Sequence, residues 1–435
     1  MSKICTKALL AVSLCAVPCA AQAKSAGPKP QLKMVVILSR HGLRSPTWTQ
    51  ARLDSYSAIP WPKWSVPPGN LTVRGHQLMK QFGGFDRGSL AREGLFAERG
   101  CADAAATYIW ADSDQRTIES GQALAEGLFP DCMLPVHGHA EGENDPLFHP
   151  AANGVKPAEA DAAFAELNAR MKQPADARQG QLIEEVNHLL LGCSLRAVCA
   201  SAHTPKMPLI SGPIVAVRGN GDHTVDLQGP LAQASSFAED FLLEYADGMP
   251  MEHVGWGKVD AAELGKLLTL HSDYFDLMHR TPALAKIEAS NMLFHIEKTL
   301  EQHVEDRPIA DAIGPVDSKL VMLVGHDTNL AGIAALLGVH WDLDGRHDDT
   351  PPGAELALEL WQDEHGVYTV RVTVAMQTLQ QLRKMPELTR AAPPARETLT
   401  LPGCAATGDR CAWNDFQKVA DRAMDRNDVF PMQKN

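Results

Sequence analysis

Residues 32–47 read LKMVVILSRHGLRSPT, and this stretch predicts the fold class. Leu32–Ser39 is apolar and rich in β-branched side chains, which indicates a strand buried on both of its faces. Arg40–Thr47 follows directly with polar and cationic side chains, and Gly42 and Pro46 interrupt any regular structure there. A buried strand that ends in such a cluster is typical of α/β proteins, in which ligands bind beyond the carboxyl ends of the strands.

Two further segments repeat this pattern of a short apolar strand followed by polar residues. Thr107–Ala111 (TYIWA) leads into Asp112–Thr117, and Leu320–Val324 (LVMLV) leads into Gly325–Asn329 (GHDTN). Residues 330–337 then have the apolar composition of a packed helix. Because the carboxyl ends of parallel strands meet at one edge of a sheet, we expect these polar clusters to lie close together.

The middle of the chain has a different periodicity. Helical spacing dominates from about residue 157 to 284, as in 158–171 and 236–245, and strand-like segments return at 355–361 and 367–376. The chain is therefore expected to form one α/β domain interrupted by a mainly α-helical insertion. The expected divisions are a signal peptide at 1–23, the two parts of the α/β domain at 24–150 and 285–435, and the helical insertion at 151–284.

The N-terminus has the pattern of a cleaved secretory signal peptide. Lys3 and Lys7 precede an apolar run over 8–20, and Ala21–Ala23 supplies a small-x-small cleavage site before Lys24. The run is short for a bilayer, and no later segment of the sequence reaches the ~18 apolar residues that spanning requires. We therefore expect a periplasmic or secreted protein with no membrane anchor after cleavage.

The composition excludes several classes of protein. With 435 residues, 45% of them hydrophobic and 21% charged, the chain has the makeup of a globular protein. Its formal net charge is −13, and loss of the signal peptide removes only two lysines, which leaves −15. Nucleic-acid binding needs a cationic field, so no nucleic-acid partner is expected.

Six cysteines remain after cleavage, and an even number in an exported chain favours disulfides. A metal site is less favoured, because no C-x-x-C pair occurs. Several connectivities are possible. Two pairs are close enough in sequence to close small loops, which leaves one longer pair: Cys193 with Cys199, Cys404 with Cys411, and Cys101 with Cys132.

The cluster after the first strand contains the residue types that bind and attack a phosphate group. Arginine forks match phosphate oxygens, so Arg40 and Arg44 indicate a pocket for a dianion. A neutral imidazole between them, His41, is suited to attack phosphorus. His326 would add charge to the phosphate site, and Asp327 would protonate the leaving alkoxide. The alternative is a solvated basic turn without a ligand.

These segments resemble the histidine acid phosphatase family, most closely its bacterial periplasmic branch of phytases and glucose-1-phosphatases. The resemblance implies a mixed sheet flanked by helices, of the phosphoglycerate-mutase-like kind, with an inserted mainly α-helical domain. It covers nearly the whole mature chain. The motifs that carry it are RHGLRSPT at 40–47, LTVRG at 71–75, ADSDQRT at 111–117, DPLF at 145–148, GMP at 248–250, GWG at 255–257, GHDTNL at 325–330, TPPGAEL at 350–356 and QTLQQLR at 377–383.

The resemblance also implies roles for individual residues. His41 would become a phosphohistidine, and Asp327 would be the proton donor. No cofactor and no metal are implied, and we expect a monomeric acid phosphatase that hydrolyses small phosphomonoesters with an acidic pH optimum. The implied phosphate-binding residues are Arg40, Arg44, Thr47, Arg116 and His326.

The substrate remains open between phytate, sugar phosphates or both. Trp48 stands where bacterial phytases of this branch usually carry a lysine, and a cysteine pair that often joins the helical insertion to the C-terminus is absent from the sequence. Gly42 matches the phytase form of the motif, where glucose-1-phosphatases usually have asparagine. The alternatives are a glucose-1-phosphatase-type sugar phosphatase with little phytase activity, and a non-catalytic phosphate-ester-binding protein.

Two further segments have less specific interpretations. His137 and His139 lie near Glu141 and Glu143, but a polar loop is a simpler explanation than a metal site, because such sites need further spaced ligands. Ile59–Pro68 (IPWPKWSVPP) is interpreted as a loop that borders the pocket, with a partner-binding site as the alternative.

Overall fold

The computed structural model describes residues 29–172, 177–192, 212–219 and 223–432. Its centre is a mixed sheet with the strand order β12-β13-β10-β9-β1-β6-β2-β3, in which β11 also pairs with β10. Strand β6 is parallel to both β1 and β2, whereas β9 is antiparallel to β1 and to β10. The strands of this sheet are β1 (Gln31–Arg40), β2 (Thr107–Ala111), β3 (Val136–His137), β6 (Leu320–Gly325), β9 (Glu355–Gln362), β10 (Tyr368–Met376), β11 (Ala395–Leu399), β12 (Ala406–Thr407) and β13 (Arg410–Ala412).

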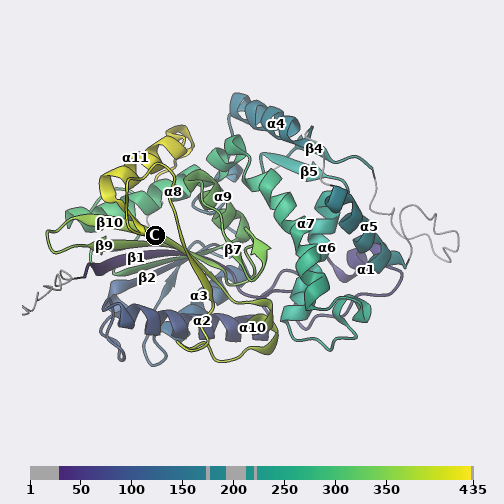
Figure 1. Ribbon diagram of the computed structural model, residues 1–435, viewed down its shortest axis with the longest axis horizontal. Coiled ribbons are helices and arrows are strands. Elements are labelled where there is room, and N and C mark those ends of the chain that lie inside the picture. Colours follow the sequence, from purple (N-terminus) through teal and green to yellow (C-terminus); the bar gives the residue numbers. More distant parts are fainter. Residues whose placement is uncertain (1–28, 173–176, 193–211, 220–222, 433–435) are drawn as a thin grey trace, which may run out of the picture.

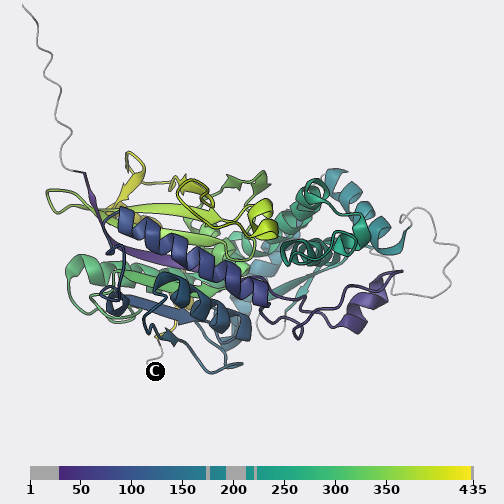
Figure 2. The same cartoon turned by 90° about the horizontal axis from the view of Figure 1, so that it is seen from below.

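Helices cover both faces of the sheet (Figure 1). On β1, Val35 and Ile37 face the core beneath one layer, while Val36 and Leu38 face the core beneath the other. This alternation buries β1 on both sides, as its continuous apolar sequence predicts. Figure 2 shows the long helix α2 running along its face of the sheet. One layer contains α2 (Val73–Arg92) and α3 (Gln115–Leu128), and the other contains α8 (Pro282–Glu305), α9 (Asp327–Leu337) and α11 (Trp413–Ala423).

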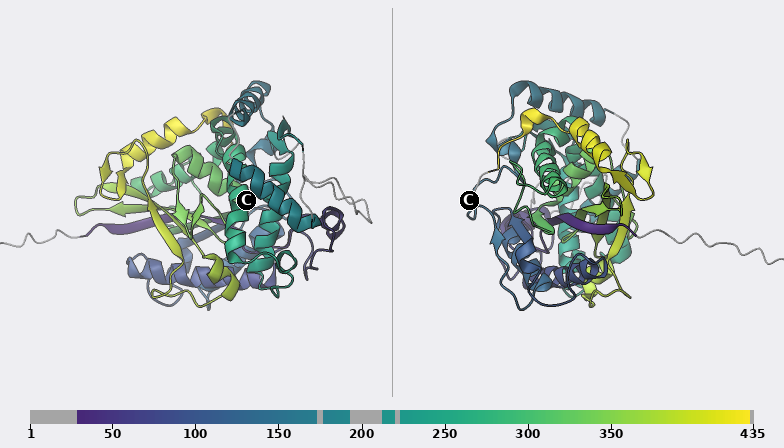
Figure 3. Two further views of the ribbon diagram at one scale, coloured as in Figure 1. Left: turned by 45° about the vertical axis from the view of Figure 1, so that its right-hand side comes forward. Right: turned by 90° about the vertical axis from the view of Figure 1, so that its left-hand side faces the viewer.

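A second, mainly helical body lies beside the sheet (Figures 1 and 3). It has its own apolar core, to which Phe237 and Phe241 contribute fully buried rings. Helix α8 joins the two bodies, because Leu284 packs in the helical core and Leu293 in the sheet core. The elements of this body are α1 (Gln50–Tyr56), α4 (Pro157–Met171), α5 (Ala177–Leu191), the hairpin β4 (Val215–Arg218) and β5 (Val225–Gln228), α6 (Pro230–Ala246) and α7 (Ala261–His279).

Short elements complete the fold. The hairpin of β7 (Asp342–Leu343) and β8 (Arg346–His347) packs against α7, and α10 (Leu379–Lys384) packs against α6. The remaining single turns are 3₁₀-helices at Ala104–Ala106, Pro150–Asn153, Val254–Gly257 and Arg426–Asp428.

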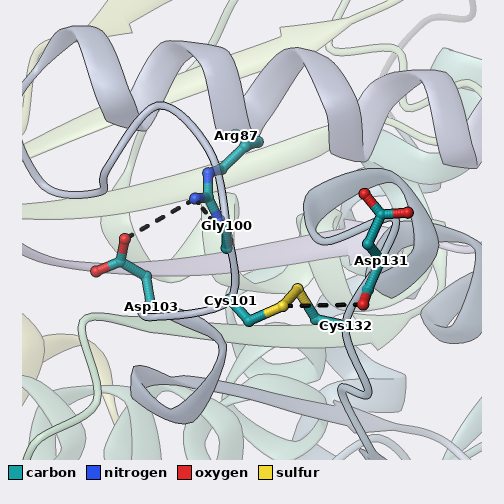
Figure 4. Close-up of a disulfide and its surroundings, with 6 residues drawn as sticks. All are labelled: Arg87, Gly100, Cys101, Asp103, Asp131 and Cys132. Carbon is teal, nitrogen blue, oxygen red and sulfur yellow. Dashed lines mark hydrogen bonds and ion pairs between the residues drawn. A yellow bond between two sulfur atoms is a disulfide. The ribbon is translucent and has the colours of Figure 1, made fainter.

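Disulfides fasten two loop regions. Cys101 and Cys132 join the segments that follow α2 and α3, with 5.6 Å between their Cα atoms (Figure 4). Beside this bridge, the Arg87 guanidinium donates to the Gly100 carbonyl at 3.2 Å. A second disulfide joins Cys404 to Cys411. The expected pair Cys193 and Cys199 lies outside the described residues.

The predicted fold class is confirmed, and the first strand extends one residue further at each end than predicted. Arg40 is the last residue of β1 rather than the first residue of the polar cluster, because its backbone pairs with Gly325 of β6. Within the described ranges, the structure contains no helix long and apolar enough to cross a membrane.

Candidate active site

The pairing of β1 with β6 brings the two histidine motifs together. Arg40 lies opposite Gly325 in the parallel register, and the His41 amide donates to the Gly325 carbonyl at 2.8 Å. His41 and His326 therefore leave adjacent strand ends side by side, with 5.5 Å between their ring centroids. Two segments almost 300 residues apart in the sequence thus meet at one edge of the sheet.

His41 is a buried, neutral imidazole. Burial lowers its pKa well below the ordinary value of 6.5, and the positive charges of Arg116 and Arg40 lower it further. Its Nδ1 lies 2.8 Å from the Gly42 carbonyl, which can only accept, so Nδ1 carries the proton. The lone pair therefore lies on Nε2, which leaves a nucleophilic nitrogen that stays unprotonated in acid.

Gly42 is required by close packing against α2. A Cβ atom at this position would lie 2.6 Å from Cγ of Met79 and 3.1 Å from the Gly75 carbonyl oxygen. The Gly42 amide also donates to the Ser120 hydroxyl of α3 at 2.8 Å. The backbone around His41 is therefore fixed by both helices on this face of the sheet.

Glu239 of α6 binds both arginines of the motif. Its carboxylate pairs with the Arg40 guanidinium and, at 2.9 Å, with that of Arg44. Burial by itself would raise the pKa of Glu239, but Arg44 and Arg40 hold it well below its ordinary range. Arg40 also donates to the Thr350 carbonyl at 2.6 Å, so its side chain is held rigidly behind the pocket.

Asp327 is the first residue of α9, and it is also paired with Arg40. Its Oδ2 lies 2.8 Å from the Arg40 guanidinium. Burial raises the pKa of this carboxyl, but Arg40 and the other positive charges nearby together outweigh burial and the opposing effect of Glu239, and lower it overall. Asp327 is therefore ionised in the substrate-free structure, whereas a proton donor must carry a proton.

Asp112 orients the second histidine. Its Oδ2 accepts from Nε2 of His326 at 2.6 Å and lies 2.9 Å from Nε2 of His149. Burial would raise the pKa of Asp112, yet the hydrogen bonds from the two histidines keep it well below its ordinary value. Nδ1 of His326 then accepts from Arg116 at 3.4 Å. Arg116 is held in turn by Asp114, 2.6 Å away.

The two histidine motifs and the segment around Asp112 and Arg116 line a cavity of about 390 Å³. Arg40 lies behind the cavity wall, where it contacts Asp327. The interpretation of Ile59–Pro68 as a border of this cavity is wrong. Lys63, Trp64, Val66 and Pro68 line a neighbouring cavity of about 330 Å³ instead. Of the residues predicted for the site, His41, Arg44, Thr47, Arg116, His326 and Asp327 all line the cavity.

Sequence reasoning missed several residues of this site. Glu239 lies in the helical run that the periodicity indicates, and the signal was an acidic pair, Glu239-Asp240, between the apolar residues Phe237 and Phe241. His271 of α7 is also buried, and it lies close to Glu239 and Asp327. Nothing in the local sequence of His149 marks it as a neighbour of Asp112.

Three groups of side chains in the described part of the chain have ligand atoms close enough to share a metal ion. His137 and His139 belong to none of them. Two of the groups lie in the site, where Arg116 is beside one and Arg40 is beside the other. The groups are Asp112 with His149 and His326, Glu239 with His271 and Asp327, and His340 with His347 and Asp348.

The site thus combines a buried neutral histidine, surrounding arginines and a histidine–aspartate pair at adjacent strand ends. The sequence model of the histidine phosphatase superfamily (branch 2) matches residues 31–375. The chain belongs to this family.

Comparisons with individual proteins agree with this assignment. The chain is 33% identical to phytase AppA of Escherichia coli, over 94% of this chain and 96% of that protein. It is 30% identical to a glucose-1-phosphatase of Salmonella typhimurium, over 96% of this chain and 99% of that protein. The structure of Hafnia alvei phytase in complex with tartrate superposes with a TM-score of 0.79 at 34% identity, covering 93% of this chain and all 100% of the other. The structure of Citrobacter braakii phytase gives a TM-score of 0.81 at 28% identity, covering 92% of this chain and 100% of the other.

Proposed function

We propose that this protein is an exported acid phosphatase that hydrolyses phosphomonoesters through a phosphohistidine on His41. The observation that carries the proposal is the state of His41: its Nδ1 proton is bound to a carbonyl, and burial with nearby arginines keeps the ring neutral. Such an imidazole remains a nucleophile at the acidic pH at which most amines and imidazoles are protonated.

In the first step, Nε2 of His41 attacks phosphorus and the P–O bond to the alcohol breaks. Arg44 and Arg116 stabilise the phosphoryl oxygens, His326 does so once the bound dianion draws a proton onto its Nδ1, and Arg40 supports them from behind the wall. The alkoxide takes its proton from Asp327. Asp327 becomes protonated because the substrate dianion neutralises the Arg40 and Arg44 charges that hold its pKa down.

In the second step, water attacks the phosphohistidine. The Asp327 carboxylate takes the proton from this water, the N–P bond breaks, and its electron pair returns to Nε2 of His41. Inorganic phosphate then leaves, and Asp327 releases this proton to solvent because Arg40 again lowers its pKa. The next substrate dianion raises the pKa of Asp327 again, so the carboxyl takes up a proton from solvent and the cycle is closed.

We propose phosphomonoesters of polyols, both inositol phosphates and sugar phosphates, as the substrate class. Relatives named phytase and glucose-1-phosphatase support both, and Hafnia alvei phytase has been crystallised with myo-inositol hexakis sulphate. Trp48 cannot supply the cation that a lysine would at this position. Its ring packs against Tyr56 and Phe237, with the Arg52 guanidinium 3.6 Å above it.

We also propose export to the periplasm or medium, with cleavage before Lys24. The charged and apolar pattern of residues 1–23 supports export, as does the pair of disulfides in the structure. The division into 24–150, 151–284 and 285–435 belongs to the same proposal. Its support is the separate apolar core of the helical body, to which α1 also contributes from within 24–150.

The proposal is tested by phosphate release from phytate, glucose 1-phosphate and 4-nitrophenyl phosphate between pH 3 and pH 8. His41→Ala should lower kcat on the order of 10³-fold or more, whereas His137→Ala, outside the cavity, should leave it unchanged. An alkaline quench during turnover should trap phosphate on His41. Full activity of His41→Ala, or complete loss of activity with a chelator, would refute the mechanism.

Asp327→Asn separates the role of the proton donor from that of the nucleophile. 4-Nitrophenolate leaves readily without a proton, but a sugar alkoxide does not. The variant should therefore lose much more activity with glucose 1-phosphate than with 4-nitrophenyl phosphate. Equal losses with both substrates would show that Asp327 acts otherwise. Binding of every ester without release of phosphate would instead identify a binding protein.

A further inference from the structure

A cluster of histidine and aspartate side chains lies on the β7–β8 hairpin, outside the catalytic cavity. Asp342 and His347 are cross-strand partners in this hairpin, and Asp344-Gly345 forms its turn, with both residues at positive φ. His340 precedes the hairpin and Asp348 follows it directly. The four side chains therefore project from one tightly turned loop of nine residues, 340–348.

The ring of His347 is oriented by Asp342. Nδ1 of His347 lies 2.9 Å from the Asp342 carboxylate, which can only accept, so Nδ1 carries the proton and Nε2 the lone pair. That lone pair faces Oδ2 of Asp348 at 3.4 Å. Two electron-rich atoms face each other there, an arrangement that a cation between them would stabilise.

Asp348 is held in place by groups on its other side. Its Oδ1 accepts from the Trp341 amide at 3.0 Å and pairs with Arg280 at 3.2 Å. Oδ2 is left to the histidines, and Nδ1 of His340 lies 2.5 Å from it. The Asp348 side chain is only 9% exposed, whereas His340 and His347 are 56% and 61% exposed. The site is thus anchored in the protein and open to solvent.

We propose that His340, His347 and Asp348 form a surface site for a zinc ion. With metal–ligand bonds of ~2.0–2.1 Å, two ligands of a tetrahedral ion lie about 3.3 Å apart, and Nε2 of His347 lies 3.4 Å from Oδ2 of Asp348. Nδ1 of His340 donates its proton to Oδ2 of Asp348, so zinc displaces that proton to solvent and the contact opens by somewhat less than 1 Å to reach that separation. Two nitrogens and one carboxylate oxygen suit zinc, whereas Mg²⁺ and Ca²⁺ prefer oxygen ligands. Water completes the fourth position.

The surrounding charges accept a divalent cation. Asp342 and Asp348 contribute two negative charges, and the Arg280 guanidinium, which also lies 3.4 Å from Nδ1 of His340, offsets one of them. The Asp342 carboxylate accepts from Nδ1 of His347 and so orients this histidine, as an outer carboxylate commonly does for a metal-binding histidine. The hairpin is joined to α7 through Ser272, which donates to the His347 carbonyl at 2.9 Å. Bound zinc therefore stabilises the contact between the hairpin and the helical body.

Calorimetric titration of the mature protein with Zn²⁺ tests the site, and the protein must carry no histidine tag. Wild type should bind zinc, and His340→Ala and His347→Ala should each weaken this site at least tenfold. Asp342→Asn should weaken it on the order of tenfold as well, because the orientation of His347 is lost. His365→Ala removes a 77% exposed histidine elsewhere and serves as the matched control, with unchanged affinity expected. Mg²⁺ should not compete.

Crystals soaked in Zn²⁺ provide a readout that does not depend on any variant. An anomalous peak within ~2.2 Å of His340, His347 and Asp348 ligand atoms is expected. Zinc affinity unchanged in a His340→Ala/His347→Ala double variant would overturn the proposal and direct attention to the catalytic cavity. No zinc binding by wild type, with no anomalous peak at the hairpin, would overturn it too.

Discussion

Replacing Asp86 by asparagine should stabilise the protein at neutral pH and change its stability little at pH 4. Asp86 of α2 and Glu355 of β9 are both buried, and their carboxyl groups are hydrogen-bonded to each other beneath the sheet. The nearby arginines, Arg371 and Arg396, are both paired with Glu359. Two acids therefore share a buried position in which at least one of them must be protonated.

The sign of the effect follows from the pKa of Asp86. Burial is the largest influence and raises this pKa from 3.8 to about 7, although the charge of Arg396 opposes the rise. A raised carboxyl pKa means that the folded state holds the proton more tightly than the unfolded chain. The stabilisation is complete below about pH 4 and is lost as the pH rises to about 7. At 1.36 kcal/mol per pKa unit, the loss at neutral pH is at most about 4 kcal/mol.

Urea unfolding of wild type and Asp86→Asn at several values between pH 4 and pH 8 measures this loss. The difference in unfolding free energy between the two proteins should grow with pH, from near zero to as much as about 4 kcal/mol in favour of the variant. Asp317→Asn, at an exposed position, is the matched control and should show a constant difference. A difference for Asp86→Asn that does not change with pH would refute the reasoning.

Two further predictions concern the disulfides and Glu239. Replacing Cys101 and Cys132 by serine opens a loop of 31 residues and should lower the unfolding free energy by about 3.7 kcal/mol. The same replacement of Cys404 and Cys411 opens a 7-residue loop and should lower it by about 2.4 kcal/mol. Equal losses of unfolding free energy in denaturant unfolding would contradict the loop-entropy explanation. Glu239→Gln removes a charge that raises the pKa of Asp327, so the alkaline limb of the kcat–pH profile should move to lower pH by on the order of one unit. An unmoved limb would mean that another group is the proton donor.

Much of the catalytic cavity could be predicted because its key residues lie in short contiguous motifs. His41 lies between Arg40 and Arg44, and His326 is followed by Asp327, each group directly after an apolar strand. Parallel strands then place both motifs at one edge of the sheet without further information. The fold class followed from the same strands and from the helical periodicity between them.

The remaining features depend on partners that the local sequence does not reveal. Glu239 approaches Arg40 only because α6 packs across the ends of the strands, and Asp86 meets Glu355 only through the packing of α2 on β9. A buried acid in a helix has the same local pattern whether its neighbour is an arginine or another acid. The ionised state of Asp327 in the absence of substrate is likewise set by a tertiary contact, the ion pair with Arg40.

The position of β6 in the sheet also controls when chemistry first becomes possible during synthesis. Strand β6 lies between β1 and β2, yet it is made more than 200 residues after them. Until then β1 has no partner on that side, and the backbone bond that positions His41 against Gly325 does not exist. A growing chain that ends before α9 therefore lacks the paired strand ends that bring His41 and His326 together. The site can therefore assemble only after residue 325 of the 435 has been made, and the order of synthesis decides when the two histidines first meet.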